Sequence, residues 1–271
     1  MNIKSDIIEF YNSGVEVNRL LLGPSKLEFE RTKEIILRYL KKAPSKILDV
    51  GGGTGAYSFW LSDIGHEVHL LDLAPVNIES AKKYSDESGK RLHSFNVGDA
   101  CNLKFESASF DVILMLGPMY HLTEKEERLQ ALGEAKRVLA SGGLLFCVGI
   151  SRYASMCDGF FSNLTKDNQF INMMNRDLQD GQHINSTGKA KYFTISYFHL
   201  PEELRNEVKG VGFVIDNLMS VESFGWLLPD FDDKWNDKNY KKLLLETIRK
   251  VESEPSLLGI GAHIMVVAHR N

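Results

Sequence analysis

The stretch ILDVGGGTGAYSFWL, from Ile47 to Leu61, decides the fold of this chain. A short apolar run precedes four glycines within five residues, and a second apolar run follows them. Strand, glycine-rich turn and helix in this order are typical of the first βα unit of an open parallel sheet, where ligands bind at the carboxyl ends of the strands. A loop without side chains also lets a ligand approach the main chain closely. The stretch therefore predicts a binding site.

Strand-like and helix-like segments alternate from Lys46 onward. The predicted strands are 46–50, 67–72, 91–97, 110–116 and 144–150, and the predicted helices are 54–64, 75–88 and 123–139. Thr123, with Glu126 three residues later, is predicted to cap the last of these helices. Apolar strands that alternate with helices indicate an α/β fold whose mainly parallel sheet is covered by helices on both faces.

The segments outside this block predict the rest of the organisation. Residues 1–45 are expected to form an N-terminal helical lid segment, and residues 46–271 one domain. Residues 151–199 interrupt the alternation and are expected to form a cap insertion rich in aromatic residues. The remaining predicted elements are a helix from Pro201, strands at 213–220 and 262–269, a charged loop at 226–235 and a helix near 240–251.

The composition is that of an ordinary globular protein, with 43% hydrophobic and 25% charged residues. A formal net charge of -4 without any basic run argues against nucleic acid or an anionic membrane as the main partner. Three cysteines without C-x-x-C spacing indicate reduced thiols, and no apolar run is long enough for a transmembrane span. A cytoplasmic protein is expected.

Two classes of ligand fit the glycine loop. From Gly51 the loop satisfies the dinucleotide fingerprint G-x-G-x-x-A, and Asp72 lies 21 residues further on, near the acidic position of NAD-binding folds. Asp49 and Asp99 add carboxylates that would repel a pyrophosphate. S-adenosylmethionine carries no phosphate but a positive sulfonium, a ribose diol and an adenine amine. Asp72 is expected to accept from the ribose hydroxyls and Asp99 from the adenine amine.

Each of these carboxylates also has a purely structural interpretation. Asp49 is explained equally well as an acceptor for the amides of the glycine loop. Asp72 has the position of a strand-end cap, and Asp99 that of a turn residue in VGDA. The sequence leaves these alternatives open.

Five blocks in the same order make the chain resemble the class I S-adenosylmethionine-dependent methyltransferases, in a branch that acts on small molecules. The blocks are DVGGGTG (Asp49–Gly55), LLD (Leu70–Asp72), GDA (Gly98–Ala100), FDVILMLGPMYHL (Phe110–Leu122) and RVLASGGLL (Arg137–Leu145). The resemblance implies a Rossmann-like, seven-stranded sheet whose last strand is antiparallel. It also implies methyl transfer from S-adenosyl-L-methionine to a small-molecule acceptor by in-line displacement.

The candidate cofactor site combines these blocks with the expected lid. Its residues are Asp49, Gly51, Gly52, Gly53, Gly55, Asp72, Leu73, Asp99, Ala100, Leu116, Tyr11 and Arg19. Tyr11 and Arg19 belong to the lid segment. Arg19 is predicted to pair with the cofactor carboxylate, and the alternative is a solvated helix residue.

The reaction demands no fixed catalytic set, because the cofactor brings the electrophile and the protein mainly aligns the reactants. Tyr120 and His121, directly after the fourth strand, are the candidate catalytic residues. His121 near its ordinary pKa would serve as a general base. Alternatively, Tyr120 packs in the interior and His121 is an exposed loop residue. No histidine spacing indicates a metal site.

Other functions compete with this interpretation: methylation of RNA or protein, NAD-dependent oxidoreduction, and cofactor binding without catalysis. Base-amine methyltransferases resemble one another in an Asn/Asp-Pro-Pro-aromatic motif after the fourth strand, whereas Leu116 to Tyr120 read LGPMY here. The Pro-Cys pair of cytosine C5 enzymes is absent from the sequence. A nucleic-acid substrate is therefore not expected, whereas the atom methylated and the oligomeric state stay open.

Overall fold

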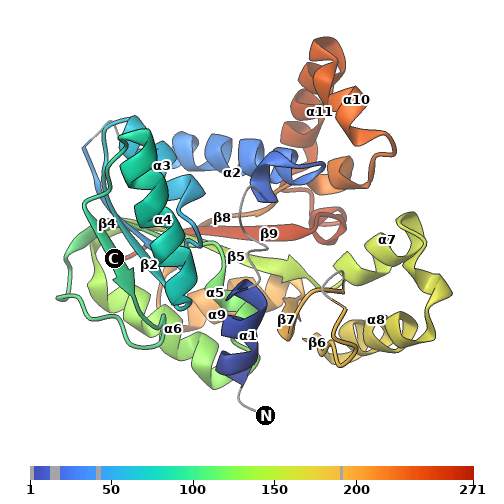
Figure 1. Cartoon of the computed structure of the whole chain (residues 1–271), viewed down its shortest axis with the longest axis horizontal. Coiled ribbons are helices and arrows are strands. Elements are labelled where there is room, and N and C mark those ends of the chain that lie inside the picture. The colour runs from blue at the N-terminus through green and yellow to red at the C-terminus, as the bar shows by residue number, and fades with distance from the viewer. Residues whose placement is uncertain (1–2, 13–18, 41–43, 190–191) are drawn as a thin grey trace.

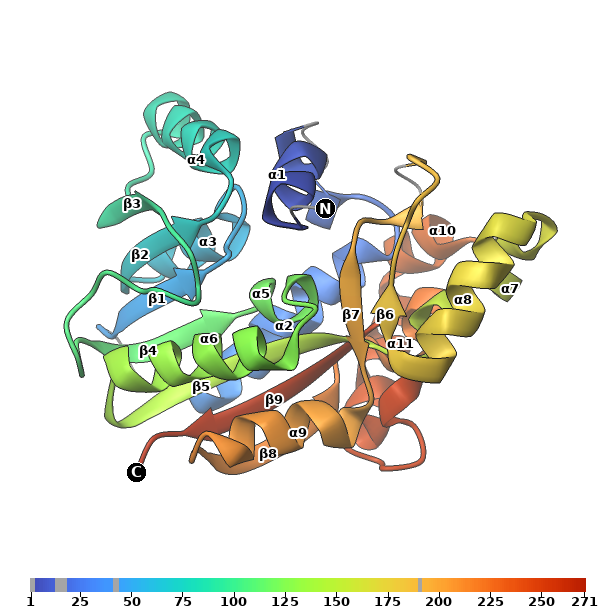
Figure 2. The same cartoon turned by 90° about the horizontal axis from the view of Figure 1, so that it is seen from below.

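The structure is a computed structural model that describes residues 3–12, 19–40, 44–189 and 192–271. Its centre is a twisted sheet with helices on both faces (Figures 1 and 2). The main strands are, in spatial order, β3 (Ser94–Val97), β2 (Glu67–Asp72), β1 (Lys46–Val50), β4 (Phe110–Met115), β5 (Leu139–Ser151), β9 (His263–His269) and β8 (Val214–Ser220). β9 runs antiparallel to both of its neighbours, whereas β3, β2, β1, β4 and β5 pair in parallel. The predicted seven-stranded, mainly parallel sheet with an antiparallel last strand is confirmed.

Helices cover both faces, so the strands are apolar on both sides. One face carries α2 (Ser25–Tyr39), α3 (Ala56–Asp63) and α4 (Pro75–Ser88), and the other carries α6 (Lys125–Val138) and α9 (Pro201–Gly210). Along β4, Val112 and Leu114 pack in the core beneath α2, α3 and α4. Ile113 and Met115 pack in the core beneath α6 and α9. The alternation follows from the two-residue period of a strand.

The predicted capping box at the start of α6 is wrong. The helix begins at Lys125, and its N-cap residue, Glu124, makes no side-chain capping hydrogen bond. Thr123 is buried, and its hydroxyl has no hydrogen-bond partner within the described residues. Arg128 holds the main chain just before the helix instead, because its Nη1 donates to the carbonyl oxygens of Leu122 (3.0 Å) and Thr123 (2.8 Å).

The N-terminal segment crosses the sheet edge that carries the glycine loop. Helix α1 (Ile3–Asn12) lies between α4 and the cap, above the short helix α5 (Pro118–His121) (Figure 2). The ring of Phe10 packs edge-on against Phe193 of the cap, with 5.8 Å between the ring centroids. The 3-10 turn η1 (Arg19–Leu21) then leads into α2. Residues 1–2, 13–18 and 41–43 of the predicted lid segment lie outside the described residues.

The cap contains α7 (Ala154–Phe161), α8 (Asn168–Asp180) and the strands β6 (Gln182–His183) and β7 (Ser196–His199). The two strands form a hairpin, and β7 also pairs in parallel with the end of β5. Sequence analysis predicted no strand here, because pairs this short have no periodicity to detect. The cap has its own core, formed by Phe170, Met173, Met174 and Tyr192. Phe160 and Phe161 instead face outward, with 65% and 64% of their surface exposed.

The predicted charged loop at 226–235 is also wrong. It contains the end of the 3-10 turn η4 (Ser223–Leu227) and most of the short helix α10 (Phe231–Asn236), which precedes α11 (Lys238–Val251). Phe231 and Trp235 are one helical turn apart and stack at 5.4 Å. Their apolar contacts with α11 stabilise this helix. The acidic residues around them had favoured the prediction of a loop.

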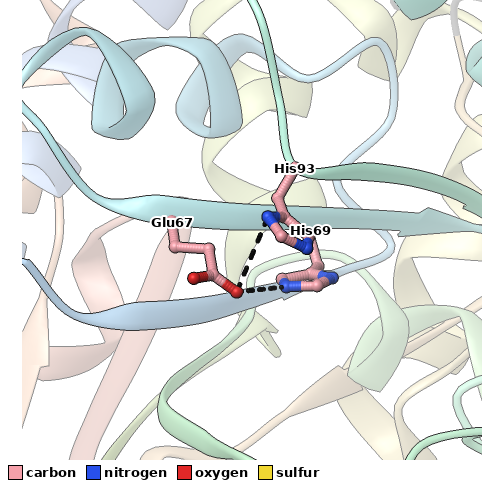
Figure 3. A group of neighbouring side chains, drawn as sticks. All are labelled: Glu67, His69 and His93. Carbon is pink, nitrogen blue, oxygen red and sulfur yellow. Dashed lines mark hydrogen bonds and ion pairs between the residues drawn. The ribbon is translucent and has the colours of Figure 1, made fainter.

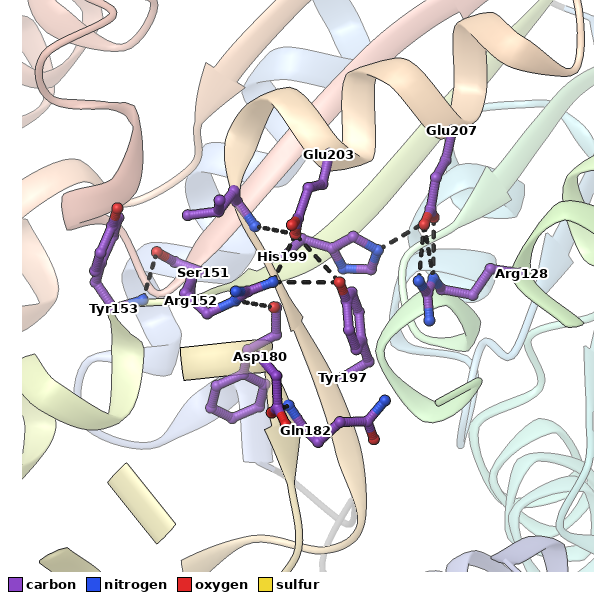
Figure 4. Close-up of polar contacts among 12 residues, drawn as sticks. Arg128, Ser151, Arg152, Tyr153, Asp180, Gln182, Tyr197, His199, Glu203 and Glu207 are labelled. Carbon is purple, nitrogen blue, oxygen red and sulfur yellow. Dashed lines mark hydrogen bonds and ion pairs between the residues drawn. The ribbon is translucent and has the colours of Figure 1, made fainter. Parts of the chain in front are cut away.

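A buried ionic network joins α6, α9 and the cap (Figure 4). The Arg128 guanidinium donates to both carboxylate oxygens of Glu207, and His199 Nε2 lies 3.3 Å from the same carboxylate. Nearby, Arg152 pairs with Glu203 at 2.6 Å. Because Arg128 also binds the carbonyl groups that follow α5, the network fixes the segment that carries Tyr120.

Cys101, Cys147 and Cys157 are buried thiols, as predicted. Within the part of the chain that the structure describes, no helix has the length and apolar character needed to cross a membrane.

Candidate active site

The glycine loop connects β1 to α3 and folds back against β2. The amides of Gly51 and Gly52 donate to the carbonyl oxygen of Leu71, at 2.7 and 3.2 Å. A Cβ on Gly51 would lie 2.8 Å from Pro118 Cγ, and one on Gly52 only 2.5 Å from Asp49 Oδ2. Both glycines are thus required by packing within the protein itself, a reason that the sequence did not reveal.

The loop forms part of the wall of a cavity of about 950 Å³, called here the first cavity. Its size lies within the range of about 300–1,000 Å³ that is typical of ligand sites. The predicted residues that line it are Asp49, Gly51, Gly52, Gly53, Asp72, Leu73, Asp99, Ala100, Leu116, Tyr11, Arg19, Tyr120 and His121. Gly55 does not line it. With a φ of 86°, Gly55 is the left-handed N-cap residue of α3.

Asp49 is the most buried carboxylate of this wall. The hydroxyl of Ser58 donates to its Oδ2 at 2.7 Å, whereas Oδ1 has no hydrogen-bond partner among the described residues. Burial, reinforced by the charge of Asp72, raises the pKa of Asp49 to about 7. The glycine amides bond elsewhere, so the predicted alternative that they donate to Asp49 is not what the structure shows.

Asp72 and Asp99 come from neighbouring strands and flank the same cavity. Asp72 Oδ2 accepts from the Gly53 amide at 2.8 Å, and its Oδ1 accepts from Ala74 N and the Asn77 side chain. Burial raises the pKa of Asp72. Asp99 Oδ1 accepts from the amide of Cys101 at 2.9 Å, so the turn role predicted for Asp99 is present.

The first cavity therefore favours a positively charged ligand. Seven carboxylates line it, and the most buried of them, Asp49, keeps an oxygen without a hydrogen-bond partner among the described residues. The arginine and lysine side chains in the wall are paired with acids: Arg19 with Glu28 at 2.7 Å, Lys33 with Glu30 at 3.3 Å and Lys90 with Asp63. Because an unpaired buried charge is costly, a ligand with a cationic centre gains more here than a pyrophosphate does.

His121 is held by the N-terminal helix. The Tyr11 hydroxyl lies 2.5 Å from His121 Nε2, and the two rings meet edge-on. Burial lowers the pKa of His121 to about 4. The prediction of a base near the ordinary histidine pKa is therefore wrong, and so is the alternative of an exposed loop residue. His121 is a neutral imidazole that joins α5 to α1.

A second cavity of about 280 Å³ adjoins the first, and Tyr11, Arg19 and Tyr120 line both. Most of its wall is aromatic or apolar: Tyr11, Tyr120, Ile150, Ala154, Phe170, Tyr192, Phe193, Phe198, Trp226 and Ala262. Its ionisable residues are Arg19, Asp158, His183 and His263. The cap thus contributes a large part of this wall.

Glu222 and His263 form a carboxylate–imidazole pair at the second cavity, and sequence analysis missed both. His263 Nδ1 lies 2.6 Å from Glu222 Oε1, and the His263 amide donates to Oε2 at 3.0 Å. Burial opposes a charge on His263, but Glu222 and Glu28 outweigh it and raise the pKa of His263 to about 9. The two residues are far apart in the chain. Their only sequence signal was that Glu222 closely follows one predicted strand and His263 lies near the start of another.

Other histidines of the cap have structural roles. His183 Nδ1 lies 2.9 Å from the buried carboxylate of Asp177, and its Nε2 lies 2.7 Å from the carbonyl oxygen of Tyr192. His199 contacts Glu207 in the ionic network. Both rings therefore have partners within the protein.

Two groups of side chains among the described residues have the spacing of metal ligands: Glu28, Glu222 and His263, and Glu67, His69 and His93. The first borders the cavities, but Arg19 already pairs with Glu28 and disfavours a cation there. The second lies at the amino end of β2, far from the glycine loop.

Comparison with known proteins agrees with this geometry. Residues 48–147 match the family model described as a methyltransferase domain, and this segment contains the glycine loop, Asp72, Asp99 and α5. Residues 48–147 therefore form a methyltransferase domain of the class I S-adenosylmethionine-dependent type. The resemblance read from the five sequence blocks is thereby confirmed.

The curated relatives of this chain differ in the substrates for which they are named. A demethylmenaquinone methyltransferase of Thermus thermophilus is 34% identical over 48% of this chain and 57% of its own length. A ubiquinone/menaquinone biosynthesis C-methyltransferase of Zymomonas mobilis is 29% identical over 68% of this chain and 76% of its own. A probable tRNA methyltransferase 9B of Mus musculus is 35% identical, over only 39% of this chain and 22% of its own. The match thus spans little more than half of the first relative and less than a quarter of the last.

Solved structures share the fold of this chain over most of its length. A methyltransferase of Methanosarcina mazei aligns over 87% of this chain and 96% of its own, with a TM-score of 0.61 and 18% identity. A [4+2]-cyclase aligns over 89% of this chain and 80% of its own, with a TM-score of 0.57 and 18% identity. The fold is therefore shared by proteins of different activity, and the substrate has to be argued from the site.

Proposed function

We propose that this methyltransferase transfers the methyl group of S-adenosylmethionine to a small, ring-bearing acceptor in the second cavity. The observation that carries the proposal is the shared wall of the two cavities, formed by Tyr11, Arg19 and Tyr120. A cofactor in the first cavity and an acceptor in the second would face each other across Tyr120. Such alignment supplies much of the acceleration in a displacement reaction.

The residues of the first cavity suit this cofactor. The buried, partnerless oxygen of Asp49 and the carboxylate of Asp72 complement a positive charge and ribose hydroxyls. Asp99 and Ala100 would contact the adenine, and Leu73 and Leu116 would supply apolar contacts. When bound, the cofactor supplies an electrophilic methyl group on a sulfonium. The chain itself contributes orientation, complementary charge and exclusion of water.

The second cavity suggests the chemistry of the acceptor. Aromatic side chains surround a space of about 280 Å³, small enough to favour a single ring system. His263, held protonated by Glu222, would donate a hydrogen bond to an oxygen on that ring. The relatives named for menaquinone and ubiquinone biosynthesis support a ring-bearing acceptor. Tyr120 would pack against the ring, and His121 would position Tyr11.

The N-terminal segment is proposed to act as a lid. Tyr11 contacts His121, Phe10 contacts the cap, and Arg19 lines both cavities. In this proposal residues 1–45 cover the cofactor, and residues 46–271, with the cap at 151–199, form the methyltransferase domain.

Two measurements test the proposal. Calorimetry with S-adenosylhomocysteine and with NAD is expected to show binding of the first and not of the second, and the reverse result would end the methyltransferase assignment. A labelled-methyl transfer screen then compares substituted phenols and quinols with tRNA and with protein. Label on a phenol or quinol supports the proposed acceptor class. Label only on tRNA or protein would overturn it while leaving the cofactor assignment intact.

A further inference from the structure

Three potential metal ligands lie together at the edge of the sheet (Figure 3). Glu67 and His69 are two residues apart on β2, so their side chains point to the same face. His93 directly precedes the edge strand β3, and its amide donates to the carbonyl oxygen of Val68 at 2.8 Å. The pairing of two adjacent parallel strands therefore brings all three side chains together.

The distances among the ligand atoms are close to those that a metal ion requires. His69 Nε2 lies 3.1 Å and His93 Nδ1 lies 3.7 Å from Glu67 Oε1. All three ligand atoms lie within 4.8 Å of one another. A tetrahedral zinc ion with bonds of about 2.0–2.1 Å needs ligand atoms about 3.3 Å apart. The side chains of Glu67 and His93 are 40% and 56% exposed, so small side-chain rotations are enough to close the remaining gap.

His69 is already oriented for coordination. Its Nδ1 lies 2.8 Å from the hydroxyl of Ser94, which also accepts from the Asn96 side chain. The ring packs edge-on against Phe110, with 5.1 Å between centroids. A partner on the second ring nitrogen and a packed ring are the usual support of a metal-bound histidine, because they fix its orientation. Only two exposed side chains would have to be ordered on binding.

We propose that Glu67, His69 and His93 bind one divalent transition-metal ion, with zinc as the best match and water at the remaining position. Two imidazole nitrogens and one carboxylate oxygen suit zinc, nickel or copper, whereas magnesium and calcium prefer oxygen ligands alone. Lys46 lies beside the site and opposes a cation there, since its Nζ is 3.6 Å from Glu67 Oε1.

The ion would join β3 to β2. Both strands run from this site to the first cavity, where β2 ends at Asp72 and β3 ends shortly before Asp99. At about 3.3 Å per residue, the metal site lies about 16 Å from Asp72 along β2. The ion would therefore stabilise the pairing of the edge strand β3 with β2, and it would take no part in methyl transfer. This inference does not depend on the proposed function.

Titration of the metal-free full chain with ZnCl₂ tests the site. Calorimetry is expected to give one ion per chain with micromolar affinity, together with a rise of several degrees in Tm that EDTA reverses. Saturation with a ligand that binds only the folded chain stabilises that chain. His93→Ala is expected to weaken binding at least tenfold, and Lys46→Met to strengthen it severalfold by removing the opposing charge.

Two control variants test whether zinc binding depends on this group of ligands and not on other histidines. His269→Ala removes a histidine that pairs with Asp216 on the far side of the sheet, and His263→Gln disrupts the other potential ligand group. Both are expected to leave zinc affinity unchanged. Unchanged affinity in His93→Ala, or loss of the bound ion in His263→Gln, would overturn the assignment. The Tm of each metal-free variant shows whether it is folded.

Discussion

At the scale of single residues, Asp49 illustrates how a binding site costs stability. Its carboxyl is fully buried, its Oδ1 has no partner among the described residues, and burial raises its pKa to about 7. An acid whose pKa is raised on folding holds its proton more strongly in the native state. Stability is therefore lost as the pH rises from about 4 to 7, by up to about 4 kcal/mol.

Asp49→Asn should accordingly stabilise the protein at pH 8 and have little effect at pH 4, where the wild-type carboxyl is already protonated. Denaturant unfolding at both pH values measures the difference. The same variant should bind S-adenosylmethionine more weakly at pH 8, because the complementary negative charge is gone. Glu87→Gln, at an exposed acid, is the control. Equal stability of Asp49→Asn and wild type at pH 8 would contradict this interpretation.

The Glu222–His263 pair yields a prediction with the same sign of pH dependence as Asp49, but in a higher pH range. Because the pKa of His263 is raised to about 9, its charge stabilises the folded chain below pH 6.5, and that stability is lost as the pH rises through 9. His263→Gln should remove this pH dependence. It should also lower methyl transfer at least tenfold while leaving S-adenosylhomocysteine affinity within twofold, since His263 lines only the second cavity. An equal loss of affinity for S-adenosylhomocysteine would contradict the proposal that His263 acts only on the acceptor.

At the scale of secondary-structure elements, the ionic network of Figure 4 determines how α5 is held. The pKa of Glu207 is lowered to about 2, since Arg128 and His199 outweigh the effect of its burial. Its contribution to stability is therefore present above pH 4.5 and is lost as the pH falls towards 2. The network stabilises the fold and orients the segment that carries Tyr120.

Arg128→Met should destabilise the protein by about 3–5 kcal/mol, because it leaves Glu207 buried without its partner and frees the Leu122 and Thr123 carbonyls. Adding Glu207→Met should restore part of the loss, since it removes the uncompensated charge. Chemical denaturation of both variants at pH 7 is the measurement. A double variant that is less stable than Arg128→Met alone would show that the carboxylate has another essential partner.

The same scale shows what the sequence can and cannot predict. The strand at 46–50, the strand at 67–72 and the helix at 75–88 have the predicted bounds, because each carries its own apolar pattern and a local stop signal. Thr123 failed as a cap because Arg128, which lies in the helix that follows, holds its carbonyl oxygen. The β6–β7 hairpin was missed because its pairing depends on β5, which lies far away in the chain.

The candidate site divides in the same way. Asp49, Asp72 and Asp99 could be predicted because each follows or ends a strand within one short sequence block. Glu222 and His263 could not, since only the antiparallel pairing of β8 with β9 brings the end of one strand beside the start of the other. Local patterns therefore locate the carboxylates of the first cavity, and long-range pairing determines the pair at the second cavity.

At the scale of the whole molecule, the N-terminal helix links the domain to its cap through Tyr11 and Phe10. A chain without residues 1–12 should remain folded, because α1 adds little to the two sheet cores. It should bind S-adenosylhomocysteine at least fivefold more weakly, since one wall of the first cavity is removed. Calorimetry and Tm measure the two effects separately. Full affinity in the shortened chain would refute the lid.

The two cavities share a wall formed by Tyr11, Arg19 and Tyr120, and this arrangement has a consequence for the kinetics. Because the same three side chains line both cavities, a ligand bound in one cavity is expected to change access to the other. Turnover should then follow a compulsory sequence, with the methyl donor entering first and its demethylated form leaving last. Product inhibition patterns would report that order without any knowledge of where the methyl group is attached.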